Sequence, residues 1–269
     1  MRKIFTLLLF MAIGHLCMAQ CPTKNTAFNS GEHLEYDLYF NWKFIWIKVG
    51  SAEMDISKTT YQGQDAYEAY LITRGSKTAD RYFVMRDTLT AFVTPDLVPL
   101  AYVKAAFEGK SYRKNEVHYT YTSEGTQLQM YYRKNDNPAQ TQTLLTTDCP
   151  YDMISMLLKA RSMDGSQFKK GDCIDFVMAD GKACKPQKII FRGHKKFTNE
   201  HTDEKYRCLV FSFVETEDNE EKEIVTFYIT DDDNHLPVRL DLNLRFGSAK
   251  AFLINAKGVR NPQTSLLKK

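Results

Sequence analysis

The residues of this chain that most resemble a metal site are Asp231-Asp232-Asp233-Asn234-His235, which directly precede an alternating apolar segment. A calcium loop of the helix-loop-helix kind needs oxygen ligands at alternate positions, a central glycine and a closing glutamate. Here His235 takes the third alternate position, the glycine is missing, and Leu236-Pro237 begins an apolar strand at once. Because Asp and Asn side chains bond their own backbone in turns, the pattern predicts a polar turn and no metal site, with a surface cation site as the alternative.

The sequence lacks the motifs of several common enzyme classes. Neither His-Glu-x-x-His nor Gly-x-Ser-x-Gly occurs, and no glycine loop is suited to cradle a phosphate. His194 and His201 lie in a lysine-rich stretch and are predicted to be surface histidines. Asp80, Asp87 and Asp96 stand near predicted strand ends, but spacing alone does not pair them as a general acid and a base. We therefore assign no catalytic residue and expect no cofactor.

The six cysteines lack the Cys-x-x-Cys spacing that is typical of zinc sites. Cys17 lies in a predicted signal peptide, so five remain, and an odd number leaves at least one unpaired or modified. Cys173 and Cys184 flank the turn-like sequence Met-Ala-Asp-Gly-Lys-Ala, and we predict a disulfide between them. Cys208 is expected to be a small buried apolar residue.

An aromatic run, Trp42-Lys43-Phe44-Ile45-Trp46, holds the candidate ligand-binding residues. Trp42, Phe44 and Trp46 share one face if the run is a strand. Three roles are open for them. They could fill a core, line an apolar groove or the mouth of a curved sheet, or make an exposed contact with a partner.

Alternation of apolar and polar residues dominates the chain and predicts β-strands. In residues 236–246 one face is apolar and the other polar, as in an antiparallel sheet with one solvated face. Seventeen Phe and fifteen Tyr fit a β-rich protein, because aromatic rings pack well on pleated surfaces. We predict a mainly β fold, a curved antiparallel sheet or half-barrel of one or two meanders. Residues 20–269 are expected to form a single domain, with possible halves at 28–147 and 164–258.

One helix is predicted, over residues 148–161, as the link between these halves. Asp148 is a candidate cap, Pro150 lies near the first turn, and Lys159 and Arg161 stand at the end, which is the usual polarity of a helix. The centre of the segment is apolar nearly all round, so the helix is expected to pack against the sheet.

The first 19 residues have the three-part layout of a secretory signal peptide: a basic start, an apolar run and a small residue, Ala19. The apolar run is shorter than the roughly 20 residues of a membrane span. We predict cleavage after Ala19 and a periplasmic protein with no transmembrane segment. An outer-membrane lipoprotein anchored through Cys21 is an alternative, although Gln20 is not the small residue that lipid attachment requires there. An uncleaved anchor is the third possibility.

Five motifs stand out along the sequence: Phe28–Phe40, Val49–Met54, Tyr151–Ser155, Asp231–Leu240 and Phe246–Leu253. Together they resemble a bacterial envelope family, domain of unknown function 3108, in a form typical of the Bacteroidetes. The resemblance covers roughly residues 28–258 and implies an exported β protein, without any catalytic residues to carry over.

The nearly balanced charge, +3 for the whole chain, argues against nucleic acid as the main partner, which would require a dense basic face. Our leading hypothesis is a non-enzymatic envelope protein that binds an apolar or amphipathic ligand such as a lipid. One alternative is a structural or assembly partner in the envelope without a small ligand. Another is an enzyme acting on cell wall or polysaccharide, which would need two carboxylates facing each other across a cleft.

Overall fold

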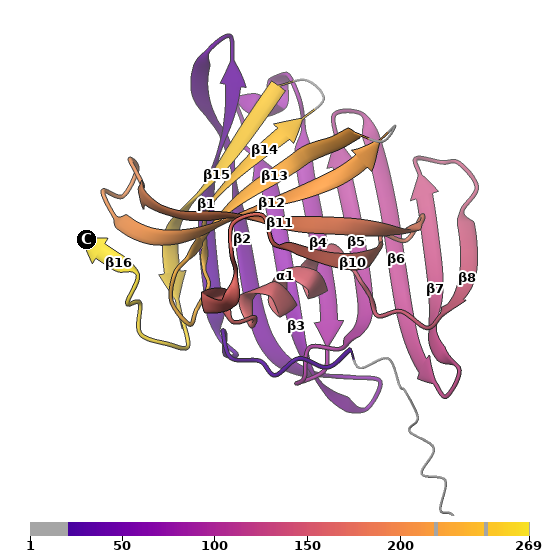
Figure 1. Cartoon of the computed structure of the whole chain (residues 1–269). Helices are drawn as coiled ribbons and strands as arrows, with labels where there is room; N and C mark the ends of the chain where they lie inside the picture. Colours follow the sequence, from indigo (N-terminus) through magenta and orange to yellow (C-terminus); the bar gives the residue numbers. More distant parts are fainter. Residues whose placement is uncertain (1–20, 218–219, 245–246, 269) are drawn as a thin grey trace, which may run out of the picture.

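A single, almost entirely antiparallel sheet accounts for most of the chain in the computed structural model, which describes residues 21–217, 220–244 and 247–268 (Figure 1). The predicted signal peptide, residues 1–19, lies outside the described residues. The strands are β1 (Glu32–Trp42), β2 (Ile45–Tyr61), β3 (Gln64–Gly75), β4 (Met85–Val93), β5 (Pro99–Glu108), β6 (Ser111–Thr122), β7 (Gly125–Lys134), β8 (Gln140–Thr146), β9 (Pro150–Tyr151), β10 (Cys173–Ala179), β11 (Cys184–Thr198), β12 (Lys205–Glu217), β13 (Glu220–Thr230), β14 (Pro237–Leu244), β15 (Gly247–Lys257) and β16 (Leu266–Lys268).

The first meander of the sheet comprises β1–β8 and the second comprises β10–β15, with β9 beside β10. The pairing of β1 with β15 joins the two meanders. The strand order of the sheet is β8-β7-β6-β5-β4-β3-β2-β1-β15-β14-β13-β12-β11-β10-β9, with β16 added beside β12. The sheet curls until the β10–β11 turn reaches the other meander, where the Asn115 side-chain amide on β6 donates to the Asp180 carbonyl at 2.7 Å. A Cβ on Gly181 in the same turn would lie 2.8 Å from the Tyr131 carbonyl oxygen on β7. The predicted curved sheet is thus confirmed.

The single α-helix of the described residues, α1 (Met153–Arg161), is shorter than predicted, and its cap lies four residues after the expected one. Asp152, not Asp148, caps it: one carboxylate oxygen accepts from the backbone amides of Ile154 at 3.0 Å and Ser155 at 2.8 Å. The preceding residues, Pro150 and Tyr151, form β9 and pair with β10 instead. Two short 3-10 turns, Ala79–Arg81 and Gly165–Gln167, complete the helical structure of the described residues. Within these ranges, each helix falls short of the length and apolarity needed to cross a bilayer.

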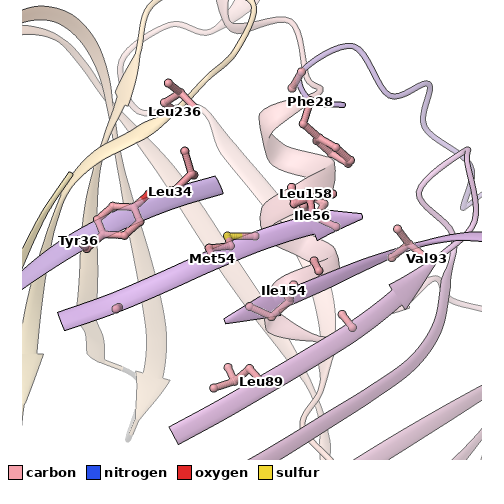
Figure 2. Close-up of a cluster of buried hydrophobic side chains, with 14 of the residues drawn as sticks. Phe28, Leu34, Tyr36, Met54, Ile56, Leu89, Val93, Ile154, Leu158 and Leu236 are labelled. Carbon is pink, nitrogen blue, oxygen red and sulfur yellow. The ribbon is translucent and has the colours of Figure 1, made fainter. Parts of the chain in front are cut away.

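The main core lies between α1 and one face of the first meander (Figure 2). Ile154 and Leu158 of the helix pack with Leu34, Met54 and Leu89, all of them nearly inaccessible to solvent. Strand alternation places these three residues on the same side of β1, β2 and β4. We call this side the helix-bearing face. In Figure 1 the strands bend around α1.

A buried ion pair fixes the last turn of α1. The guanidinium of Arg161 donates to both carboxylate oxygens of Glu32, at 2.6 and 2.9 Å, and each side chain is 1% exposed or less. Arg161 also donates to the carbonyl of Asn234, at 3.2 and 3.1 Å, in the turn between β13 and β14. The guanidinium therefore holds together the helix, the first strand and a turn of the second meander.

Removing one partner of this pair should destabilise the fold strongly, because it leaves an uncompensated charge in the core. We expect Arg161→Met or Glu32→Gln to lower the free energy of unfolding by about 3–5 kcal/mol. The measurement is urea denaturation followed by circular dichroism. Arg86→Met, which removes the exposed ion pair with Asp80, is the matched control and should have little effect. Equal stability of the Arg161 variant and the wild type would contradict the assigned role.

Candidate functional site

An unbroken row of apolar residues crosses eight neighbouring strands from β10 to β2 on one face of the sheet. Each residue is paired directly with the next, so all share that face. The residues, called the apolar row below, are Ile174, Ile189, Phe213, Val225, Leu242, Ala249, Phe40 and Ile47. All but Ile47 are half-buried, and Ile47 is exposed.

The apolar row lies on the helix-bearing face, beyond the reach of α1. On β1, Phe40 alternates with Leu38, Tyr36 and Leu34, and the last two belong to the core around the helix. A nine-residue helix is about 14 Å long, whereas the 17 residues of β2 span about 55 Å. The helix therefore covers only one end of the face, and the apolar row occupies the part left over.

The same face becomes charged on the neighbouring strands β4, β5 and β6. Asp87 lies two residues before Leu89 on β4 and therefore shares its face. It is paired with Ala106 on β5, which is paired in turn with Arg113 on β6. Lys104 and Glu108 alternate with Ala106 on β5 and share the face. Asp87, Lys104, Glu108 and Arg113 are called the charged cluster below. The helix-bearing face thus has an apolar sector and a charged sector.

The electrostatics of the charged cluster centre on Asp87. Burial, followed by the nearby negative charge of Glu108, raises the pKa of Asp87 to about 6, while Lys104 and Arg113 act in the opposite direction. Arg113 forms an ion pair with Glu108. The Oδ1 atom of Asp87 is buried and has no hydrogen-bond partner among the described residues. Buried acceptors are rarely left unpaired, so this oxygen has the capacity to accept a further hydrogen bond.

The predicted ligand-binding aromatics lie on the β1–β2 hairpin and not on one strand face. The turn at Lys43 and Phe44, both with positive φ, separates Trp42 from Trp46. Trp42 is paired with Ile45 and lies on the side of the apolar row. Trp46 is paired with Asn41 and faces the opposite side, where the Lys250 ammonium lies 4.0 Å from the centre of its ring. The three side chains are 58%, 96% and 36% exposed, so the core-filling role is wrong.

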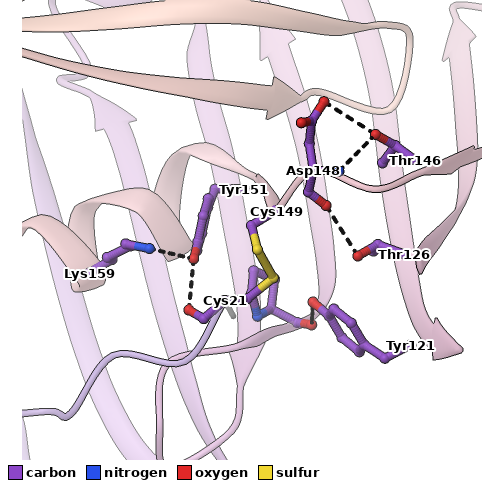
Figure 3. Close-up of a disulfide and its surroundings, with 9 residues drawn as sticks. Cys21, Tyr121, Thr126, Thr146, Asp148, Cys149, Tyr151 and Lys159 are labelled. Atoms are coloured by element: carbon purple, nitrogen blue, oxygen red, sulfur yellow. Dashed lines mark hydrogen bonds between the residues drawn. A yellow bond between two sulfur atoms is a disulfide. The ribbon is translucent and has the colours of Figure 1, made fainter. Parts of the chain in front are cut away.

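The disulfide of the structure joins Cys21 to Cys149, 128 positions apart, next to the start of α1 (Figure 3). Tyr151 adds two hydrogen bonds beside this disulfide. Its hydroxyl donates to the Cys21 carbonyl at 2.9 Å and accepts from the Lys159 ammonium at 2.6 Å. A lipid thioether on Cys21 and this disulfide exclude each other.

The predicted Cys173–Cys184 bond is wrong. These residues stand at opposite ends of the β10–β11 pair, since Cys173 is opposite Ile190 and Cys184 is opposite Ala179. Both are free thiols, as is the buried Cys208.

The acidic sequence before β14 is a turn, as predicted. The Asp232 carboxylate accepts from the Thr230 hydroxyl at 3.0 Å and from the Asn234 amide at 3.2 Å, which closes the turn. Its second oxygen accepts from the backbone amide of Ser265 at 3.1 Å. In the described part of the chain, no three His, Cys, Asp or Glu side chains are grouped in a way that could hold a metal ion. His194 and His201 are exposed, as expected.

Two pockets flank the β10–β11 turn; the lining of the first is mixed and that of the second is mainly polar. One, of about 340 Å³, is lined among others by Asp175, Lys185 and Glu215. The other, of about 310 Å³, lies between this turn and β8, with Gln140 and Lys182 in its wall. Neither has the predominantly apolar lining of a typical small-molecule site.

Comparison with known families fits this architecture. The model of a family described as "Protein of unknown function (DUF3108)" matches residues 35–254. The chain belongs to the DUF3108 family. Among curated proteins, none matches this DUF3108 chain at a significant level.

Two solved structures resemble the DUF3108 chain. One is a β-barrel-like protein of the DUF1849 family from Brucella abortus, with a TM-score of 0.57 and 10% identity over 86% of this chain and 98% of that one. The other, from Bacteroides fragilis NCTC 9343, has a YmcC-like fold, a TM-score of 0.37 and 8% identity over 88% of this chain and all of that one. The first shares the fold; the second similarity is too low to support an argument.

Removing the Cys21–Cys149 disulfide should loosen the whole DUF3108 fold, because the bond closes a very long loop. We expect Cys149→Ser, or added reductant, to lower the free energy of unfolding by about 2–5 kcal/mol. Cys173→Ser is the control and should leave stability unchanged. Thiol titration of the oxidised, unfolded mature chain should count the three free cysteines. Five reactive thiols before reduction would contradict the assignment.

Proposed function

We propose that this DUF3108 protein is a non-enzymatic protein of the periplasm that binds an amphipathic, lipid-like molecule on the helix-bearing face. The apolar row would take the hydrocarbon part of the ligand, and the charged cluster its polar group. The single observation that carries this proposal is the division of one sheet face into an uninterrupted apolar sector and a charged sector.

The curl of the sheet supports this arrangement. Because the β10–β11 turn touches β6 and β7, the strands that carry the apolar row bend toward those that carry the charged cluster. Half-burial leaves the side chains of the row in partial contact with solvent. A bound hydrocarbon chain would remove that remaining surface from water, which is favourable in proportion to the apolar area covered.

Export accounts for two further features. The N-terminal residues have the layout of a signal peptide, and disulfides persist in oxidising compartments such as the periplasm. The Cys21–Cys149 bond, which begins two residues after the proposed cleavage site, is consistent with that location.

The enzyme alternative has less support. Glycosidases of the common kind need two carboxylates on opposite sides of a scissile bond. Asp87 and Glu108 are neighbours on one face, and Glu108 is engaged by Arg113. The alternative of an assembly partner is favoured by the exposed aromatic hairpin, which offers a surface outside the proposed ligand site.

Native mass spectrometry of the mature protein, prepared without detergent, tests the proposed function. We expect a mass excess that disappears on denaturation, and displacement of an apolar dye by a short-chain phospholipid. Leu242→Ser and Phe213→Ser should each weaken lipid binding about tenfold, because each removes much of the apolar contact of one side chain. Leu145→Ser, an exposed position on β8, is the matched control. A bare mass together with no displacement by any lipid would overturn the proposal.

The charged cluster also predicts a pH dependence. Below about pH 6 Asp87 is neutral, so Lys104 and Arg113 outweigh Glu108; above it the cluster is balanced. Affinity for an anionic short-chain lipid should therefore fall several-fold as the pH rises from 5 to 7, measured by dye displacement. Asp87→Asn should bind similarly at both pH values. A pH dependence that persists in this variant would assign the effect to another group.

A further inference from the structure

Large exposed apolar side chains gather at one rim of the sheet. Nine of the thirteen found in the described part of the chain lie in or beside the β1–β2, β3–β4 and β5–β6 turns, or at the end of β14. Alternating strand directions bring these three turns and the end of β14 to the same end of the sheet. The nine residues, called the apolar rim, are Trp42, Phe44, Ile45, Trp46, Ile47, Tyr82, Phe83, Phe107 and Leu244.

Direct contacts hold the three turns together. The backbone amide of Ser76 donates to the Val49 carbonyl at 2.7 Å, joining the β3–β4 segment to β2. The amide of Gly109 donates to the Val84 carbonyl at 2.8 Å, joining the β5–β6 turn to the same segment. A Cβ on Gly109 would lie 3.0 Å from the Phe83 ring. Contacts between neighbouring segments therefore link the three turns along the rim.

The β1–β2 hairpin projects beyond its neighbour on one side. Strand β3 ends at Gly75, opposite Gly50, while β2 begins five residues earlier, at Ile45. At about 3.3 Å per residue the hairpin extends roughly 15 Å past the end of β3. Phe44, 96% exposed, is at its tip. Figure 1 shows this hairpin rising above the other strands.

The charges around the apolar rim are mainly basic. Lys43, Lys77, Arg81 and Lys110 lie in the three joined turns, and none of them forms an ion pair with a residue that the structure describes. The one acid within these turns, Asp80, is paired with Arg86. A further cation, Lys250, lies over the Trp46 ring. The rim therefore complements a surface that is apolar inside and negatively charged at its boundary.

We propose that the apolar rim docks this protein onto an anionic phospholipid bilayer. Phe44, Trp42 and Ile45 would enter the boundary between head groups and acyl chains, where Trp is favoured. The basic turn residues would meet anionic head groups, each contributing near the surface. The rim shares only Ile47 with the apolar row, and the variants that test the two proposals leave this residue unchanged, so membrane docking and ligand binding can fail separately. A protein partner would prefer the same apolar residues but would not require phospholipid.

Vesicle binding tests the proposal with the protein's own fluorophores, because both tryptophans of the chain lie on the projecting hairpin. Addition of mixed phosphatidylcholine and phosphatidylglycerol vesicles should shift the tryptophan emission to the blue and carry the protein into the vesicle pellet. Pure phosphatidylcholine vesicles should do so at least tenfold less well, and salt should weaken the binding.

Two variants separate the apolar and basic contributions. Phe44→Ser combined with Ile45→Ser should reduce vesicle binding about tenfold or more, since two exposed apolar side chains no longer insert. Lys77→Glu combined with Arg81→Glu should remove the preference for anionic vesicles. Leu145→Ser and Lys58→Glu, exposed positions away from the rim, are the matched controls. Short-chain lipid should still displace the apolar dye from both rim variants, as the ligand proposal requires.

Absence of vesicle binding by the wild type, or binding without a blue shift, would overturn the docking proposal. So would equal binding of wild type and both rim variants. If short-chain lipid fails to displace the dye from the wild type while the vesicles do bind it, only the ligand proposal is overturned.

Discussion

The contact on which the rest of the structure depends is the buried guanidinium of Arg161. Taking a charge out of water is costly, and it is tolerated only when a good counter-ion and further hydrogen bonds are present. Glu32 and the Asn234 carbonyl supply both. Because these groups come from the helix, the first strand and the β13–β14 turn, α1 has one permitted position between the two meanders, and its position decides which part of the sheet face stays uncovered.

The division of the helix-bearing face follows from that position. Near α1 the face is closed by Leu and Ile side chains, and farther along the strands it carries the apolar row and the charged cluster. Nine helical residues are too few to cover strands of up to 17. An antiparallel sheet of this size usually exposes a polar face to water. Here the uncovered part includes apolar residues on eight strands, and the proposed ligand site rests on this departure from the usual pattern.

Much of this architecture could be predicted from local patterns. Alternation identified the strands, and the basic residues and proline located the helix within a few residues. The predicted start of the helix was wrong because Pro150 and Tyr151 form β9 and pair with β10. The cap of the helix is therefore Asp152. The condition for the aromatic run to share one face, that it be a single strand, is not met because Lys43 and Phe44 adopt positive φ, a conformation that non-glycine residues seldom take. The apolar row depends on the register of eight strands, and the Cys21–Cys149 bond on proximity across 128 positions. Neither property is visible in a local stretch of sequence.

The pairing of β1 with β15, near the C-terminal end of the sequence, has a consequence for biogenesis. Glu35 and Asn255, hydrogen-bonded across β1 and β15, are 220 positions apart. A chain made from its N-terminus exposes β1 early, yet the neighbour of that strand emerges almost at the end of synthesis. Until then the first meander has two unpaired edges, which are templates for aggregation, and such non-local pairing is slow to form. The protein should therefore depend on a holding chaperone while it is being made, and truncations near the C-terminus should be harmful far beyond the few residues they remove.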